Sequence, residues 1–289
     1  MRATLPTLFA GLLLASCAPD TGKRKVSQGV CGDLEPTRHL VARQLFFARA
    51  ADGVAQGFDL DGAVTASGDA TGCGKEDYTS PDGVSGVDNA IAGLLPFLDS
   101  TEAVGLEPLI QSAINGGEIL VLLELTGLDD LRDDDCVGVR LLFGDGVPAV
   151  GSDGLLLVDQ TFPVSDEIPM DEPVIGTLRD GVLEAEGLAF DLPVDIFDAN
   201  LVFEISNAAV RLSMNDETGI GDGILGGSFP YSNVLDGLLD TNIDQGLKDA
   251  LPALVSGLSD LEPAADGLCQ NMSVTLELGL ADAFVYSEE

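Results

Sequence analysis

An acidic, glycine-rich stretch between residues 52 and 89 holds the residue types that bind calcium. It contains the sequence Asp59-Leu60-Asp61-Gly62, and further oxygen ligands follow at Asp82, Asp88 and Asn89. Calcium loops begin with such an Asp-x-Asp-Gly sequence, because alternate carboxylates point at one centre and glycine allows the tight turn that adds a backbone carbonyl. We therefore predict a calcium site formed by Asp59, Asp61, Asp82, Asp88 and Asn89.

The rest of this stretch departs from the twelve-residue EF-hand, since no glutamate stands at its last position. Asp82, Asp88 or Asn89 would have to fold back onto the first two aspartates. The alternative is that these residues only form turns, with Asp88 capping the helix that follows. Two other acidic stretches, 129–135 and 215–222, are weaker calcium candidates and are typical of solvated turns.

Most other catalytic or cofactor sites lack the residues that they need. His39 is the single histidine, which favours a structural or surface role, and the chain has no Gly-x-Ser-x-Gly, Cys-x-x-Cys, His-x-x-x-His or Walker-type sequence. A carboxylate-dependent hydrolase stays open, because 49 acidic residues supply any spacing. With no tryptophan and three tyrosines, however, a sugar-stacking cleft is hard to build. We expect no enzyme and assign no catalytic residue.

The N-terminus has the organisation of an export signal. A short leader with Arg2 is followed by an apolar stretch from Leu5 to Leu14, which is too short to span a bilayer. The sequence Leu14-Ala15-Ser16-Cys17 resembles a lipobox, the recognition sequence of the lipoprotein signal peptidase. This resemblance to bacterial lipoproteins implies a signal peptide over residues 1–16 and a lipid attached to Cys17. An ordinary secretory peptide cleaved nearby would also export the chain.

Residues 17–30 predict a lipidated cysteine followed by a flexible polar tether. Ala18, and not an aspartate, follows Cys17. By resemblance to the sorting rule of enterobacterial lipoproteins, this favours the outer membrane over the inner membrane. The chain would then face the periplasm or the cell surface. The basic run Lys23-Arg24-Lys25 would lie near anionic head groups or act as a solvated linker.

Four cysteines remain after Cys17, and an even number in an exported chain predicts two disulfides. The candidates are Cys31, Cys73, Cys136 and Cys269. Three pairings are possible, and the sequence does not choose among them.

The body of the chain is strongly acidic and still apolar enough to fold. Residues 50–289 hold 46 acidic residues and six basic ones, while 45% of the whole chain is hydrophobic. Phosphate backbones would repel such a surface, so we expect no nucleic-acid partner. The apolar content predicts a sizeable core, in a single domain over residues 31–289.

Apolar spacing predicts two pairs of amphipathic helices. One pair lies within 88–115, with a second helix opened by Pro108, and the other lies within 232–262, with a kink or break at Pro252. Residues 52–89 show no apolar face and predict a loop.

The remaining segments alternate as strands do. Residues 39–48 predict a strand, with a short helix as the alternative, and a bent strand with a bulge near Ala208 is expected at 200–215. The other predicted strands are 119–125, 137–143, 174–178, 182–192 and 274–280. Because strands and helices are segregated, the class is α+β, with a mainly antiparallel sheet stapled by disulfides.

Two main function classes agree with these features. The protein is either a non-catalytic binding or structural module of the envelope, which would bind another envelope component and be stabilised by calcium, or a periplasmic carrier of lipid or another hydrophobic ligand. The leucine-rich helices favour the first class, since such helices are more often core than ligand tunnel.

Overall fold

The computed structural model describes residues 31, 36–70, 72–100, 106–165, 172–196, 199–239 and 245–286. The predicted signal peptide, Cys17 and the tether therefore lie outside the described residues. The described part is α+β, with one large, mainly antiparallel sheet, as the sequence predicts. Within the described residues, no helix is both long and apolar enough to cross a membrane.

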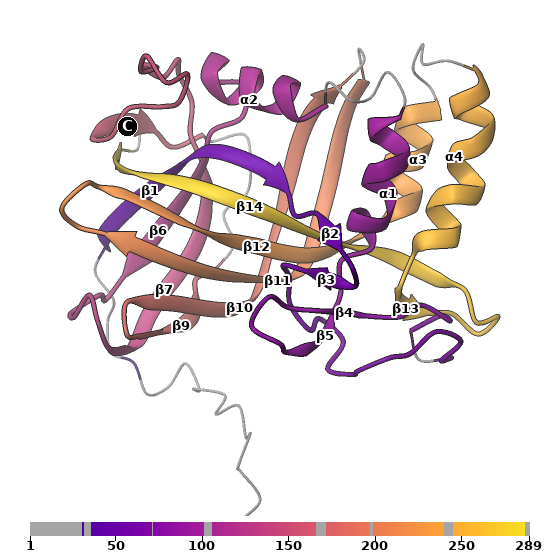
Figure 1. The fold of residues 1–289 in the computed structure, drawn as a ribbon. Helices are drawn as coiled ribbons and strands as arrows, with labels where there is room; N and C mark the ends of the chain where they lie inside the picture. Colours follow the sequence, from indigo (N-terminus) through magenta and orange to yellow (C-terminus); the bar gives the residue numbers. More distant parts are fainter. Residues whose placement is uncertain are drawn as a thin grey trace, which may run out of the picture.

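The large sheet closes on itself, because its last long strand pairs with two others. β14 is hydrogen-bonded to β12 along one edge and to β1 along the other, both antiparallel (Figure 1). The order round the closed sheet is β1-β6-β7-β9-β10-β11-β12-β14. These strands are β1 (Pro36–Phe47), β6 (Val121–Thr126), β7 (Asp134–Phe143), β9 (Val174–Arg179), β10 (Val182–Ile196), β11 (Ala199–Asn215), β12 (Ile220–Pro230) and β14 (Cys269–Tyr286).

Two short strands complete this sheet along β14. β13 (Leu261–Pro263) pairs antiparallel with its beginning, and β8 (Gln160–Pro163) pairs parallel with its end. The predicted strands at 174–178 and 182–192 are β9 and β10, which form a hairpin, and its tight turn has Asp180 and Gly181 both at positive φ, which fits a primed turn. The predicted bulge is also confirmed, because the pairing of β11 shifts between Ser206 and Ala209.

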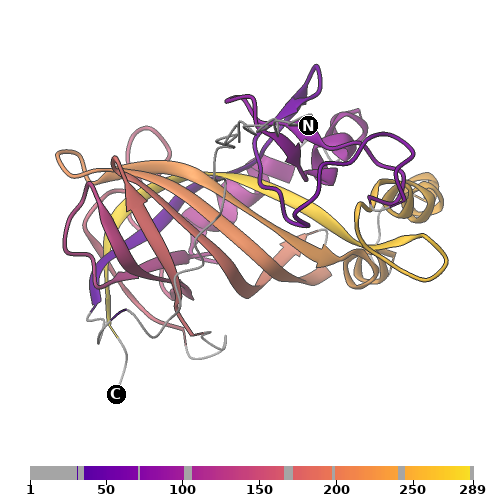
Figure 2. The ribbon, with the colours of Figure 1, turned by 90° about the horizontal axis from the view of Figure 1, so that it is seen from below.

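The helices gather mainly at one end of the sheet. α1, α3 and α4 lie together there, and α2 runs along β1 (Figures 1 and 2). Their bounds are α1 (Ala90–Asp99), α2 (Leu106–Gly116), α3 (Tyr231–Leu239) and α4 (Gln245–Leu258). Of the predicted kink or break at Pro252, the break is absent, since α4 continues through this residue. Pro252 is exposed, so water can solvate the carbonyl that loses its helical partner.

The core fills with leucine. The alternation at 119–125 implies a strand with one buried face. In the structure every residue of β6 is buried, so both faces of this strand are covered. Side-chain atoms of Leu122 in β6 and Phe162 in β8 both lie next to Gly144. The segment between β7 and β9, which contains β8, therefore covers one face of β6. The largest fully buried side chains include Leu40, Leu122, Leu125, Leu142, Leu183, Leu212 and Leu280.

Besides the short strands β8 and β13, two further segments form strands that the sequence does not predict. β12 contains glycine at 221, 223, 226 and 227, and glycine lowers strand propensity. A small four-stranded sheet, whose first strand directly precedes the acidic stretch, replaces the expected plain loop. Its strands are β2 (Ala50–Ala51), β3 (Val54–Ala55), β4 (Tyr78–Thr79) and β5 (Ser85–Val87). Each has only two or three residues, which is too short for an apolar period to show.

Two disulfides staple the chain, as predicted. Cys31 is bonded to Cys136 at the start of β7, and Cys73 of the acidic stretch is bonded to Cys269 at the start of β14. The Cα atoms of the two pairs are 5.6 and 5.7 Å apart, within the usual range for a disulfide. The Cys73–Cys269 disulfide therefore ties the acidic stretch to β14, the strand that closes the sheet.

Candidate metal centre

Three of the five predicted ligands converge. One carboxylate oxygen each from Asp59, Asp61 and Asp88 lies within 4.8 Å of the others. Asp59 and Asp61 come from the Asp-x-Asp-Gly sequence, and Asp88 comes from the other end of the stretch, directly after β5. Asp88 therefore makes the predicted fold-back onto the first two aspartates. Hard oxygen ligands grouped in this way suit calcium.

Hydrogen bonds hold the two ends of the stretch together. The backbone N–H of Asp88 donates to the carbonyl of Phe58 at 2.9 Å, and the N–H of Leu60 donates to Oδ2 of Asp88 at 2.7 Å. Within the turn, Oδ1 of Asp59 accepts from Gly62 and Oδ1 of Asp61 accepts from Ala63. Gly62 has a φ of 77°, so the turn needs a residue that tolerates the left-handed region.

The other two predicted ligands have different places. Asp82 lies in an exposed turn, in which the N–H of Gly83 donates to Ser80, and it is outside the cluster. Asn89 is the N-cap of α1, and its Oδ1 accepts from the N–H of Ala92. Its Nδ2 donates to the carbonyls of Ala48 and Gln56. The expectation that Asp88 caps this helix is thus wrong by one residue, because the side chain of Asp88 turns toward Leu60.

The charged form of Asp88 is unfavourable in this environment. Its side chain belongs to a residue that is 3% exposed, and burial raises the pKa of Asp88 to about 8, with further contributions from the carboxylates of Asp260, Asp61 and Asp77. Within the described part of the chain, no lysine or arginine forms an ion pair with Asp61 or Asp88. A bound cation would supply the missing positive charge.

The cluster is docked on the large sheet at the bulge of β11. Nδ2 of Asn207, the bulge residue at a φ of 48°, donates to the carbonyl of Leu60 at 2.7 Å. The ring of Phe58 lies under the guanidinium of Arg211, 5.4 Å from the ring centroid, and a Cβ at Gly226 would meet this ring. Glycine in β12 therefore makes room for Phe58, and Leu60 links the sheet to Asp88.

Sequence reasoning missed the buried acid behind the cluster. Asp260, between α4 and β13, accepts hydrogen bonds from the N–H and the hydroxyl of Ser273. Burial raises the pKa of Asp260 to about 6, while the bonds from Ser273 lower it. No local pattern in the sequence marks Asp260, because its proximity to the acidic stretch depends on the pairing of β13 with β14.

The weaker calcium candidates are turns. In the 129–135 turn, Asp134 accepts from the N–H of Asp129, and Arg132 and Arg179 pair with neighbouring aspartates. In the 215–222 turn, Asn215 accepts from two backbone N–H groups and Asp216 pairs with Arg38. Neither turn brings three carboxylates together among the described residues.

His39 belongs to a row of polar side chains on the sheet. Its Nε2 lies 3.3 Å from Oε2 of Glu124, and Glu124 also pairs with Arg140 on the next strand. The hydrogen bond from His39, and then the charge of Arg140, keep the pKa of Glu124 below its usual value although burial acts against them. This arrangement suits a structural ion pair across β1, β6 and β7.

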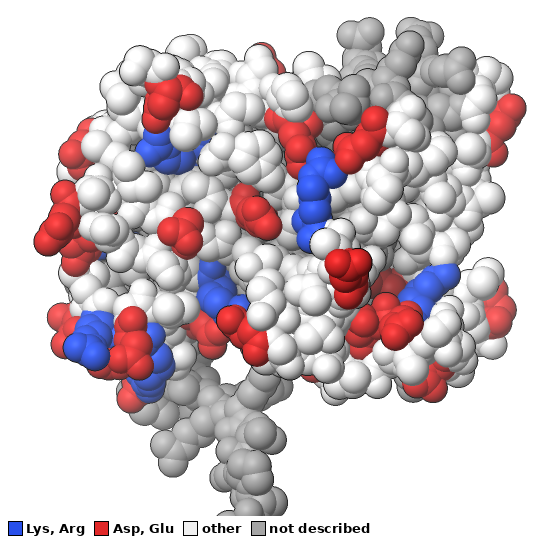
Figure 3. Space-filling model, in the orientation of Figure 1, with Lys and Arg blue, Asp and Glu red and all other residues white. Residues whose placement is uncertain are grey.

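Acidic side chains are spread over the face shown in Figure 3, and the few basic ones there lie beside acidic ones.

Comparison with known protein families, with curated proteins and with solved structures found no match.

Proposed function

We propose that this protein is a lipid-anchored, non-catalytic module of the bacterial envelope, whose acidic loop is stabilised by calcium. The observation that carries the calcium part is the convergence of Asp59, Asp61 and Asp88 from the two ends of one stretch. Three carboxylates, one of them buried, cannot all stay charged at this spacing without a cation. The anchor rests on the lipobox at Cys17 and on the two disulfides, which fit an oxidising compartment.

A structural module is favoured over a lipid carrier by the packing of the sheet. Leu40, Leu125 and Leu280 are each at most 2% exposed, which supports a packed structural core at these positions. A calcium-stiffened loop on a disulfide-stapled sheet suits binding of another envelope component.

Thermal unfolding of the full-length protein in neutral detergent, with calcium or with a chelator, tests the calcium site. Calcium at 100 times its dissociation constant should add about 2.7 kcal/mol to the free energy of unfolding. The variant Asp59→Ala/Asp61→Ala should lose this increment. The control Asp82→Ala/Asp222→Ala removes two exposed carboxylates outside the cluster and should keep it. Equal stability of the wild type in both buffers would refute the calcium site.

The anchor has its own test in a bacterial host. Cys17→Ser removes the thiol that receives lipid, so the protein should move from the membrane fraction to the soluble fraction, whereas Ser27→Ala should stay with the membrane. Fractionation and labelling with a radioactive fatty acid measure both effects. Retention of Cys17→Ser on the membrane would argue against the lipid anchor.

A further inference from the structure

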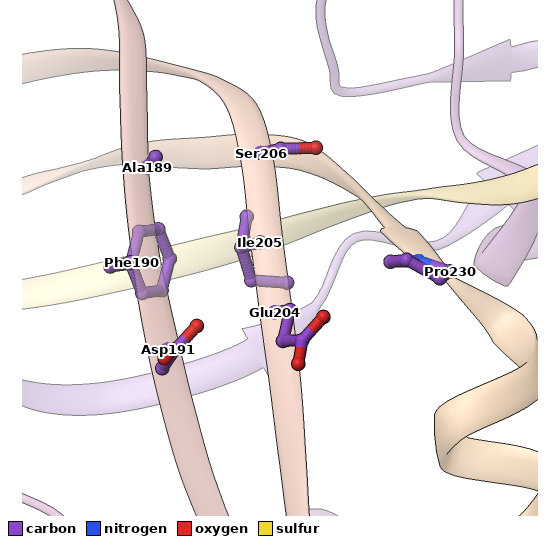
Figure 4. Close-up of a pocket in the computed structure, with 7 residues that line it drawn as sticks. All are labelled: Ala189, Phe190, Asp191, Glu204, Ile205, Ser206 and Pro230. Atoms are coloured by element: carbon purple, nitrogen blue, oxygen red, sulfur yellow. The ribbon is translucent and has the colours of Figure 1, made fainter.

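A buried arginine in β1 lacks part of the hydrogen bonding that its charge requires. Arg43 is 9% exposed, and no other lysine or arginine among the described residues is as deeply buried. The open pocket beside β11, of about 300 Å³, differs in this respect, because its polar lining residues Asp191, Glu204 and Ser206 are exposed to water (Figure 4). A buried charge is costly unless it is paired and hydrogen-bonded, so the surroundings of Arg43 call for an explanation.

The fold places Arg43 at a bulge of β1. The pairing of β1 with β14 shifts between Ala42 and Gln44, so Arg43 is the extra residue on β1. Gly279 of β14 leaves room here, because a Cβ at this position would lie 3.1 Å from Cβ of Gln44 and 3.5 Å from Cγ of Arg43. Bulges re-aim a side chain relative to the regular strand. The guanidinium of Arg43 thereby reaches Asp153, in the segment between β7 and β8.

Only half of one edge of this guanidinium is used. Nη2 of Arg43 donates to Oδ2 of Asp153 at 2.9 Å, while Nε, on the same edge, is buried without a hydrogen-bond partner among the described residues. Oδ1 of Asp153 accepts from the N–H of Leu155 instead. Arg38 shows the complete arrangement, since its Nε and Nη2 donate to the two carboxylate oxygens of Asp282 at 2.8 and 2.9 Å. The edge of Arg43 therefore has the geometry for a carboxylate and holds only one oxygen of Asp153.

A buried acceptor without a partner lies beside Arg43. Nε2 of Gln111, in α2, donates to the carbonyl of Arg43 and to Oδ1 of Asn115, both at 3.0 Å. Oε1 of the same side chain is buried and has no hydrogen-bond partner within the described part of the chain. A carboxylate that carries an N–H or O–H next to it offers both missing groups, an acceptor for Nε of Arg43 and a donor for Oε1 of Gln111.

Asp153 can leave this place without loss of the turn that carries it. Its side chain is 57% exposed, against 10% for that of Arg43. The turn is closed by backbone bonds, from the N–H of Gly151 to Leu155 at 2.8 Å and from the N–H of Gly154 to Gly151 at 3.1 Å. Neither bond involves the carboxylate of Asp153, which can therefore rotate into water and free both donors of the edge.

We propose that Arg43 and Gln111 form a binding site for a carboxylate with a neighbouring N–H or O–H donor, and that Asp153 occupies this site in the free protein. The two ligand oxygens take Nε and Nη2 of Arg43, and the donor takes Oε1 of Gln111. A small 2-hydroxy acid and the C-terminal residue of a peptide both have this chemistry. The site shares no residue with the calcium cluster, so the two sites can fail separately.

Isothermal titration of the full-length protein in neutral detergent, at constant ionic strength, tests the proposal with three probes. Lactate represents a 2-hydroxy acid, N-acetylglycine represents a peptide C-terminus, and propionate is a carboxylate without the neighbouring donor. At least one of lactate and N-acetylglycine should bind saturably. It should bind about fivefold more tightly than propionate, which leaves Oε1 of Gln111 unpaired. The tighter of the two probes identifies the source of the carboxylate.

Two variants should change the affinity for this probe in opposite directions. Asp153→Ala should tighten binding by about tenfold or more, because it removes the competing carboxylate. Arg43→Lys should weaken binding by about tenfold or more, because lysine keeps the charge and lacks the two-donor edge. Gln111→Leu removes the unpaired acceptor, so the preferred probe should then bind no better than propionate.

Asp99→Ala is the matched control, since it takes a carboxylate away from Arg49, whose side chain is 49% exposed and stays solvated. This variant should bind the probe as the wild type does. Absence of saturable binding in both the wild type and Asp153→Ala would overturn the proposal. Equal gains in Asp153→Ala and Asp99→Ala, or a preference over propionate that survives Gln111→Leu, would overturn it too.

Discussion

Asp88→Asn should make the protein more stable in the presence of a chelator at pH 8, although it removes a ligand of the proposed calcium site. The folded protein holds the pKa of Asp88 at about 8, well above the ordinary value of 3.8, mainly because of burial. Each unit of such a shift is worth about 1.4 kcal/mol, so ionising Asp88 costs the metal-free fold several kcal/mol. Asparagine has no charge to bury, and its Oδ1 can still accept from the N–H of Leu60.

The pH dependence has a definite sign. A carboxyl group whose pKa is raised by folding stabilises the fold fully below its unfolded pKa, and this contribution is lost as pH rises through the folded value. In chelator, the free energy of unfolding should therefore fall between about pH 4 and pH 8. Asp88→Asn should keep only the part below about pH 6, which belongs to Asp260. Urea unfolding at several pH values measures both curves.

Asp82→Asn is the matched control for this experiment, because it removes the same charge from an exposed turn of the same stretch. It should follow the wild type at every pH. Adding calcium should reverse the order, since the wild type gains stability and Asp88→Asn does not. A loss of stability in Asp88→Asn under chelator at pH 8 would contradict the assignment of a buried, strained charge to this residue.

The sequence predicts those parts of the fold whose apolar period is long. The strand at 39–48, the helices around 88–115 and 232–262, and the bulge near Ala208 all depend on side chains repeating over several residues, and all are present. The structure of β12 depends instead on space. A Cβ at Gly226 would clash with Phe58, and a Cβ at Gly227 would clash with Ile205. These positions therefore require glycine because of residues distant in the sequence, which no local pattern reveals.

The candidate metal site likewise has one part that the sequence predicts and one part that it does not. Asp59 and Asp61 are recognisable because an Asp-x-Asp-Gly turn is local, and Asp88 lies at a plausible distance along the chain. Asn207 and Asp260 contribute through the pairings of β11 and β13, which bring residues more than a hundred positions away to the acidic stretch. Closure of the sheet through β14 is likewise a property of two long-range pairings.

Removal of the Cys73–Cys269 disulfide, by Cys73→Ser/Cys269→Ser, should cost about 2–5 kcal/mol of stability. The bridge joins residues 196 positions apart, so its loss frees a long loop in the unfolded chain. Cys31→Ser/Cys136→Ser is the comparison, with a separation of 105 residues. Loop entropy grows slowly with length, so the two losses should agree within about 1 kcal/mol. Urea unfolding of both variants measures them, and wild-type stability in either would contradict the prediction.

The variant Cys73→Ser/Cys269→Ser also tests what holds the calcium cluster in place. Asp59, Asp61 and Asp88 are connected to the sheet through Leu60 and Asn207, whereas Cys73 lies in a part of the stretch held by the bonds of Asp77 to Thr65. The calcium increment should therefore survive loss of the bridge, and the two contributions should add, as they do for independent sites. An increment that disappears with the disulfide would mean that the bridge, and not the bulge of β11, positions the three carboxylates.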